Sequence, residues 1–194
     1  TIHAIWTENA SSPTRVRYAG VSVTPVSITD NTASSSNITP KVISYSGTTG
    51  ATQPSTMRHL VRTSEATLHS FIQMGTNTTT CGSGGLWWLY STDSGTTWTC
   101  GGQLLSDTSY LMYADARADA SDNLYAVYSV AASGRADTYD VFYRKLTKGA
   151  GSTWTLEAAQ TALNGSATGT GYHYATVELE GTTRAWIATR YFDG

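Results

Sequence analysis

Three of the strands that the sequence predicts begin with side chains able to exchange protons or to bind sugar hydroxyls and anions: Arg58 and His59, Tyr113 and Asp115, and Tyr172 and His173. Arginine can pair with a carboxylate through two hydrogen bonds, tyrosine and histidine can act as acids or bases, and aromatic faces stack on pyranose rings. Such residues suit chemistry on carbohydrates. Histidine and tyrosine in a strand also serve ordinary packing and hydrogen bonding, so both interpretations stay open.

Other reactive side chains have simpler interpretations. Three carboxylates could suggest calcium: Asp115, Asp119 and Asp122. The segment 119–123, however, is typical of a hairpin turn. The four histidines lack the short spacing of a metal site. His3 and His69 each stand second in one of the related strand segments described below, which favours a packing role. Because the chain also has no phosphate loop, Ser-His-Asp context or CxxC motif, we expect no metal and no cofactor.

The elements that must position these residues are marked by a polar segment from Ser91 to Trp98. Asp93 can accept hydrogen bonds from backbone N–H groups just ahead of it, and Gly95 tolerates positive φ. Trp98 then starts the next strand with a large apolar anchor. The sequence therefore predicts a strand–turn–strand unit whose structural residues are Ser91, Asp93, Gly95, Thr97 and Trp98.

This segment fills every fixed position of an Asp-box, Ser/Thr-x-Asp-x-Gly-x-Thr-Trp. It resembles the motif of the sialidase-like, or BNR-repeat, β-propellers, in which it joins the third and fourth strands of a blade at the rim, away from the active site. A degraded copy, Thr147 to Trp154, follows 56 residues later and has Gly149 where the aspartate would stand. Two copies in one register indicate a repeat.

Four related strand segments support that repeat, because they recur about every 55 to 65 residues and begin at Ile2, Leu68, Leu124 and Ala185. We expect an all-β chain of four-stranded antiparallel blades, spanning roughly 1–56, 57–110, 111–170 and the start of another at 171–194. A β-sandwich with an accidental Asp-box is the alternative, but the long period argues against it. Residues 87–90, including Trp87 and Trp88, are expected in the core, since both faces of a blade are covered.

About three blades cannot close a ring, since propellers have about 4 to 8. We therefore expect the ring to be incomplete within this chain and to be completed by missing blades or by other copies.

The resemblance also implies where a site would lie. In sialidase-like propellers the residues that start the innermost strands line the central cleft, which here means Arg58, His59, Tyr113, Asp115, Tyr172 and His173. The chain lacks the Arg-Ile-Pro motif of true sialidases. The histidines and tyrosines resemble instead those of propeller polysaccharide lyases, which deprotonate a uronic acid.

Composition restricts the partners. Charged residues make up 13% and the net charge is -2, so no basic patch for nucleic acid is expected. No run approaches the roughly 20 apolar residues that span a bilayer. Cys81 and Cys100 flank the Asp-box hairpin and would be brought together by it, which predicts a disulfide and an oxidising, secreted or cell-surface location.

Two functions remain open at this point. One is a carbohydrate-active enzyme, a glycoside hydrolase or polysaccharide lyase, acting on a glycan through the six residues above. The other is a non-catalytic adhesive, glycan-binding or filament-forming propeller. Because one fold serves many functions, the Asp-box does not decide between them.

Overall fold

The computed structural model describes residues 2–8, 14–21, 41–46, 58–75, 81–106, 113–131, 139–165 and 170–193. Every regular element in these ranges is a β-strand, and the strands pair antiparallel, so the all-β expectation is confirmed. No helix of the described ranges has the length and apolar character needed to cross a membrane. The strands form four sheets that follow one another along the sequence.

The first two sheets contain strands β1 to β7. Sheet A has the order β1-β2-β3 and consists of Ile2–Glu8, Thr14–Val21 and Lys41–Ser46. Sheet B has the order β4-β5-β6-β7 and consists of Leu60–Arg62, Leu68–Met74, Gly85–Ser91 and Thr99–Leu105. In sheet B each strand pairs with the strand that follows it in the chain, as expected of a four-stranded meander.

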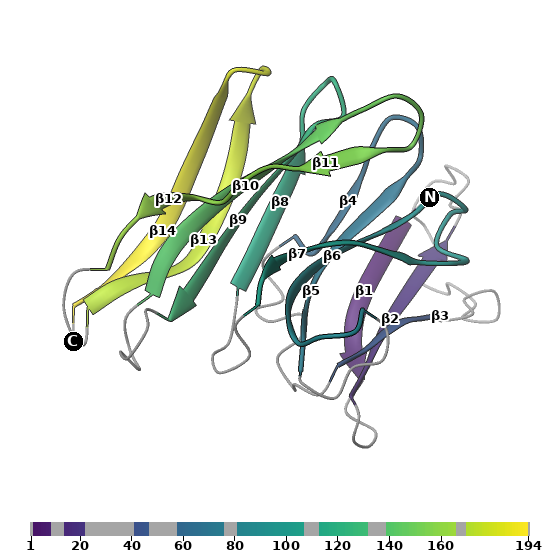
Figure 1. Ribbon diagram of the computed structural model, residues 1–194, viewed down its shortest axis with the longest axis horizontal. Coiled ribbons are helices and arrows are strands. Elements are labelled where there is room, and N and C mark those ends of the chain that lie inside the picture. Colours follow the sequence, from purple (N-terminus) through teal and green to yellow (C-terminus); the bar gives the residue numbers. More distant parts are fainter. Residues whose placement is uncertain are drawn as a thin grey trace, which may run out of the picture.

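The last two sheets contain strands β8 to β14. Sheet C has the order β8-β9-β10-β11, with β12 also paired to β10, and consists of Tyr113–Ala118, Leu124–Ala131, Tyr139–Lys148, Trp154–Leu156 and Gln160–Leu163. Sheet D pairs β13 with β14, which are Thr170–Glu180 and Arg184–Asp193. Figure 1 shows the four sheets side by side, from sheet D through C and B to A.

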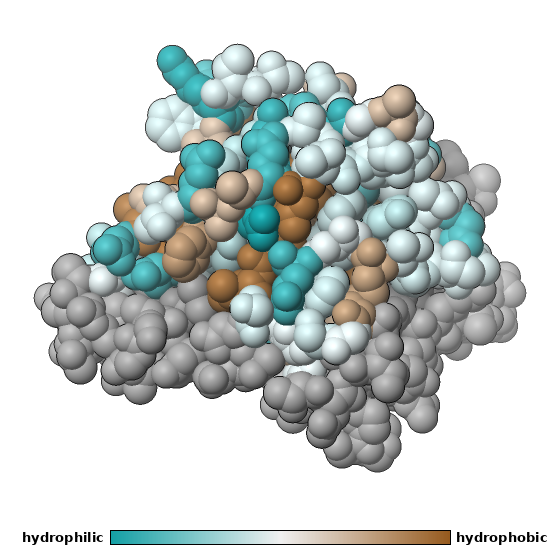
Figure 2. Space-filling view, in the orientation of Figure 1, coloured by the Kyte–Doolittle hydropathy of each residue, from teal (hydrophilic) through white to brown (hydrophobic). Residues whose placement is uncertain are grey.

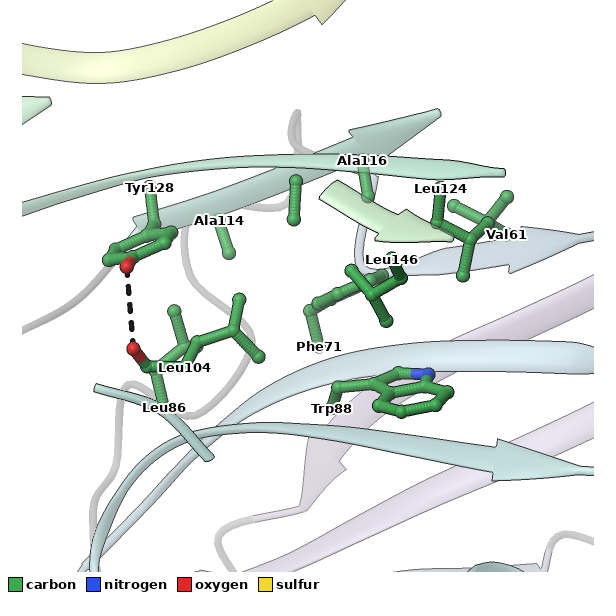
Figure 3. Close-up of a cluster of buried hydrophobic side chains, with 11 residues drawn as sticks. Val61, Phe71, Leu86, Trp88, Leu104, Ala114, Ala116, Leu124, Tyr128 and Leu146 are labelled. Atoms are coloured by element: carbon green, nitrogen blue, oxygen red, sulfur yellow. Dashed lines mark hydrogen bonds between the residues drawn. The ribbon is translucent and has the colours of Figure 1, made fainter. Parts of the chain in front are cut away.

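Sheets B and C pack face to face over the main apolar cluster (Figure 3). Phe71 and Trp88 of sheet B meet Leu124 and Leu146 of sheet C, and all four are buried. The Tyr128 hydroxyl of β9 donates to the Leu104 carbonyl of β7 at 3.3 Å, so a polar bond also crosses this interface. Burial of large side chains at this density is the main stabilising term of such an interface.

Both faces of sheets B and C are covered, which explains why their strands are apolar on both sides. Along β6, Trp88 belongs to the cluster between sheets B and C, whereas Leu89 belongs to a second cluster with Leu68, Ile72 and Met74 on the opposite face. A third cluster joins sheet C to sheet D and contains Val127, Val141, Ala175 and Val177. The expectation that the tryptophan-rich segment lies in the core is confirmed for Trp88, which is 2% exposed.

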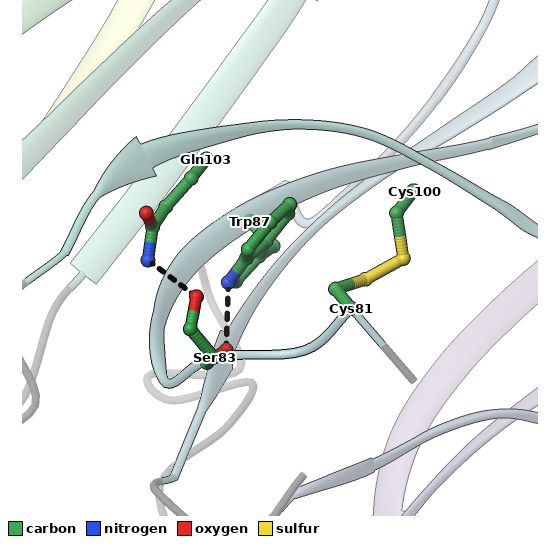
Figure 4. The surroundings of a disulfide bond; sticks show 5 residues. All are labelled: Cys81, Ser83, Trp87, Cys100 and Gln103. Carbon is green, nitrogen blue, oxygen red and sulfur yellow. Dashed lines mark hydrogen bonds between the residues drawn. A yellow bond between two sulfur atoms is a disulfide. The ribbon is translucent and has the colours of Figure 1, made fainter. Parts of the chain in front are cut away.

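The predicted disulfide between Cys81 and Cys100 is present, with the two Cα atoms 5.8 Å apart (Figure 4). Nearby polar contacts hold the segment that leads into β6: the Trp87 indole donates to the Ser83 carbonyl at 3.0 Å, and the Gln103 amide donates to Ser83 Oγ at 3.2 Å. Closing a loop of 19 residues stabilises the folded state by about 3 kcal/mol. The disulfide therefore links the start of the Asp-box hairpin to its last strand.

Candidate functional site

The Asp-box forms the β6–β7 turn, and its aspartate organises it. The Asp93 carboxylate accepts from the Thr97 backbone N–H at 2.8 and 3.0 Å and from the Thr97 hydroxyl at 2.7 Å. Ser91 Oγ donates to the same carboxylate at 2.8 Å and accepts from the Gly95 N–H at 2.8 Å. Gly95 has a φ of 87°, as the sequence predicted. These bonds, led by the Thr97 backbone N–H, lower the pKa of Asp93 from 3.8 to about 2.

The degraded copy forms the β10–β11 turn in a different way. The Gly149 N–H donates to the Thr153 carbonyl at 2.9 Å, and the Thr153 hydroxyl donates to the Ala150 carbonyl at 2.7 Å. The Lys148 ammonium donates to the Gly151 carbonyl, and it also lies 4.8 Å from the centre of the Trp154 ring. Backbone acceptors thus replace the missing carboxylate, and the turn keeps its place between the third and fourth strands of sheet C.

Asp115 lies on β8, where it connects three sheets. Its carboxylate accepts from the backbone N–H of Arg58 at 2.7 Å and of Val177 at 3.0 Å, and Arg117 Nη1 lies 3.4 Å away. The residue is 2% exposed. Because two backbone donors and a guanidinium occupy its oxygens, Asp115 joins the segment just before β4 and strand β13 to sheet C. This is a structural role that the sequence did not predict.

A cluster of charged side chains lies beside Asp115. Glu178 Oε2 is 3.6 Å from an Arg58 nitrogen and accepts from Arg117 Nε and Nη2 at 3.2 Å. The Arg58 and Glu178 side chains are 52% and 70% exposed, whereas that of Arg117 is 12% exposed. Two guanidinium groups therefore share one solvent-facing carboxylate oxygen, and Arg58 retains most of its contact with water.

Glu178 was missing from the residues selected by sequence. The sequence did contain a pattern that indicates this pair. Arg117 lies opposite Tyr125 on the neighbouring strand, and Glu178 lies opposite Trp186. Tyr125 and Trp186 are the second residues of the related strand segments that begin at Leu124 and Ala185. Arg117 and Glu178 thus hold the same position in sheets C and D. A charge at that position in both repeats could have suggested the ion pair.

The aromatic candidates lie at the start of β8 and β13. The Tyr113 ring is 4.8 Å from that of Tyr174, and the His173 ring is 5.8 Å from Tyr174, so Tyr174 lies next to both predicted residues. Tyr174 has a φ of 55° at an irregularity of the β13–β14 pairing. Positive φ is unfavourable for a bulky residue and costs on the order of 1–3 kcal/mol. The backbone here is strained where the aromatic side chains meet.

The remaining two candidates lie in packed surroundings. His59 is buried, and its carbonyl accepts from the Phe71 N–H at 3.0 Å, which extends the β4–β5 pairing. Tyr172 packs against the apolar cluster between sheets C and D, with its ring 5.2 Å from Tyr191. The structure therefore brings Arg58 to Asp115, and Tyr113 and His173 to Tyr174, whereas Tyr172 lies against Tyr191.

The carboxylates near residue 120 form a hairpin turn. Asp119 Oδ1 accepts from the backbone N–H groups of Ser121 and Asn123 at 2.8 and 2.9 Å, and the Asp122 N–H donates to the Asp119 carbonyl at 3.0 Å. The turn interpretation of this segment is confirmed. No group of three or more potential metal ligands occurs in the part of the chain that the structure describes.

The chain was also compared with known proteins. No protein-family model matches it, and no curated protein matches its sequence.

Proposed function

We propose that the chain is part of a sialidase-like β-propeller that binds an acidic glycan through the inner strands of sheets B, C and D. The serial antiparallel sheets and the face-to-face packing of B on C support this architecture. So do the positions of the two Asp-box copies, each between the third and fourth strands of its sheet. These features are what repeated four-stranded blades require.

The observation that carries the functional proposal is the exposed Arg58 guanidinium beside Glu178 and Arg117. An ion pair between exposed groups is worth about 0 to 1 kcal/mol, so Glu178 holds Arg58 weakly. A ligand carboxylate can replace Glu178 and accept two parallel hydrogen bonds from the guanidinium. Uronic and sialic acids carry such a carboxylate on their pyranose ring.

Binding without turnover is the favoured form of this function. Asp115, the carboxylic acid among the six candidates, already accepts from two backbone N–H groups and lies beside Arg117. A buried carboxylate with that many partners is poorly placed to exchange a proton with a substrate. We therefore propose a glycan-binding module.

A second candidate function is a lyase in which Tyr174 and His173, with Tyr113 nearby, take the C5 proton of a uronic acid and return a proton to the leaving oxygen. The C4–O glycosidic bond breaks and a C4–C5 double bond forms. The strained backbone at Tyr174 favours this alternative, because strain of that kind gathers at functional sites. It shares the Arg58 carboxylate contact with the binding module.

We also propose where the protein is located and how its ring is completed. A disulfide is typical of secreted and cell-surface proteins, so we place the protein there. Sheet D contains the large exposed apolar side chains of the described residues, Tyr174, Trp186 and Tyr191. Further blades, from additional residues or from other copies, would cover Trp186 and Tyr191, whereas Tyr174 lies against Tyr113 of sheet C.

The test replaces Arg58 with alanine and uses Arg62→Ala as the matched control. Both arginines are exposed at the start of sheet B, and each change removes one positive charge. Binding to polygalacturonate, hyaluronan and polysialic acid is measured by calorimetry, with the same samples monitored for unsaturated or reducing products. We expect the affinity of Arg58→Ala for one of the three polymers to fall at least tenfold and the affinity of Arg62→Ala to change little. We expect no unsaturated or reducing product.

Product formation that stops in Tyr174→Phe would favour the lyase. Equal affinity of the wild type and Arg58→Ala for all three polymers, or no binding of any, would refute the proposal.

A further inference from the structure

A cavity of about 190 Å³ lies between sheets B and C, on the side of their third and fourth strands. Trp88 and Tyr90 of β6 and Gly101 of β7 line it from sheet B, and Ser152, Thr153 and Trp154 line it from the β10–β11 turn of sheet C. None of these residues belongs to the charged cluster on the inner strands. The cavity is thus a separate place on the molecule.

The aromatic walls of the cavity are held in place. Trp88 and Tyr90 stack with ring centres 5.3 Å apart, and Trp154 lies 6.5 Å from Tyr90. The Trp88 indole donates to His69 Nδ1 at 3.1 Å, and the Trp154 indole donates to the Asp122 carbonyl at 2.8 Å. Because both indole N–H groups are already bonded and Trp88 is only 2% exposed, the half-buried Tyr90 and Trp154 rings supply the apolar surface, and Trp88 supports Tyr90 from behind. Their fixed positions reduce the entropy lost on binding.

Gly101 is needed for this arrangement. A Cβ at that position would lie 2.3 Å from a carbon of the Trp88 ring, so the ring rests directly on the glycine backbone. Any larger residue would displace the ring.

The polar wall depends on the loss of the Asp-box aspartate. In the intact turn the Thr97 hydroxyl donates to Asp93, whereas in the degraded turn the Thr153 hydroxyl donates to the Ala150 carbonyl. A Cβ at Gly149 would lie 2.6 Å from Thr153 Oγ1, so glycine makes room for this hydroxyl position. The Thr153 oxygen keeps its lone pairs, and Ser152 adds a second hydroxyl to the lining.

We propose that this cavity binds one neutral pyranose unit. Aromatic rings beside hydroxyl groups match a sugar ring, which has apolar C–H faces and polar edges. The lining residues carry no formal charge, and the nearby Lys148 ammonium on the Trp154 ring is paired with Glu65 at 3.2 Å, which favours a neutral sugar over an acidic one. The volume exceeds the about 150 Å³ that holds one benzene ring and the pocket opens to solvent, so a sugar ring can enter in part while its outer hydroxyl groups stay in water.

The test fills the cavity from its rim. Ser152→Trp places a large ring at the cavity, and Thr96→Trp is the matched control, since Thr96 occupies the equivalent exposed position of the intact Asp-box. The probes are the methyl pyranosides of glucose, galactose, mannose and fucose, and binding is measured by tryptophan fluorescence and ligand-observed NMR. We expect at least one probe to bind with a millimolar dissociation constant. Its affinity should fall at least tenfold in Ser152→Trp and change less than twofold in Thr96→Trp.

Two further variants keep the outcome decisive. Thr153→Val retains the side-chain shape but removes the hydroxyl, so it should weaken binding at least threefold even if Ser152→Trp folds poorly. Arg58→Ala should leave binding of these neutral probes unchanged, which separates this site from the one on the inner strands. Absence of binding to all four probes, or equal losses in Ser152→Trp and Thr96→Trp, would overturn the proposal.

Discussion

At the scale of single residues, His69 is the group whose protonation state is most strongly fixed by the fold. It is fully buried between sheets B and C, accepts a hydrogen bond from Trp88 on Nδ1, and has its ring 4.5 Å from that of Trp154. Burial lowers its pKa from 6.5 to about 3; Asp122 opposes the shift and Lys148 adds to it. His69 is therefore neutral in the folded protein and donates no proton from Nδ1.

We predict an acid-dependent loss of stability from His69. Its pKa is lower in the folded state, so as pH falls below 6.5 the unfolded chain takes up the proton first. The free energy of unfolding should then fall by up to about 1.4 kcal/mol per pH unit towards pH 3. Urea unfolding of the wild type and His69→Gln between pH 7 and pH 5 measures this, since glutamine retains an acceptor for Trp88 but does not titrate. Parallel pH dependences in the two proteins would contradict the assignment.

At the scale of the element, the two Asp-box turns show that one backbone position can be stabilised by different side chains. The intact turn uses the Asp93 carboxylate, whereas the degraded turn uses carbonyl acceptors and the Lys148 ammonium. A second glycine with positive φ, Gly151 at 59°, occupies the place of Gly95. The motif therefore determines where the turn lies in the sheet, whereas the hydrogen bonds within the turn differ between the two copies.

Replacing Asp93 with asparagine should lower the melting temperature by a few degrees and remove an acid-dependent step. The pKa of Asp93 is lower in the folded state, so its contribution is present above about pH 4 and is lost as pH falls to about 2. Thermal melts across this range compare Asp93→Asn with Thr92→Ala, an exposed neighbour. If Asp93→Asn and Thr92→Ala melted alike at pH 6, the carboxylate would not organise the turn.

Sequence predicted these elements well where side chains alternate between two buried faces. The strand segments predicted to begin at Leu68 and Leu124 correspond to Leu68–Met74 and Leu124–Ala131. Strand β12 was not predicted, since its four residues, QTAL, are mostly exposed and follow no alternation. The ion pairs of Glu178 and the role of Asp115 depend on the contact between different sheets, which no local pattern encodes. The propeller itself stays a prediction.

At the scale of the whole molecule, sheet D differs from sheets B and C because one face is left open. Ile187 packs towards sheet C, whereas its neighbour Trp186 is 61% exposed. The free edge of β14 has no paired strand among the described residues. An exposed tryptophan beside an unpaired strand is typical of a surface that another sheet covers.

We therefore predict that a polypeptide of these 194 residues self-associates, so that its native mass exceeds 20.7 kDa. Trp186→Ser should shift the population towards the monomer, because it removes the largest apolar side chain from the open face of β14. Thr155→Ala, at an exposed position on β11, should not. Sedimentation velocity at several micromolar concentrations measures the distribution. A stable wild-type monomer of 20.7 kDa across that range would contradict the covering of sheet D by other copies and leave additional residues as the source of further blades.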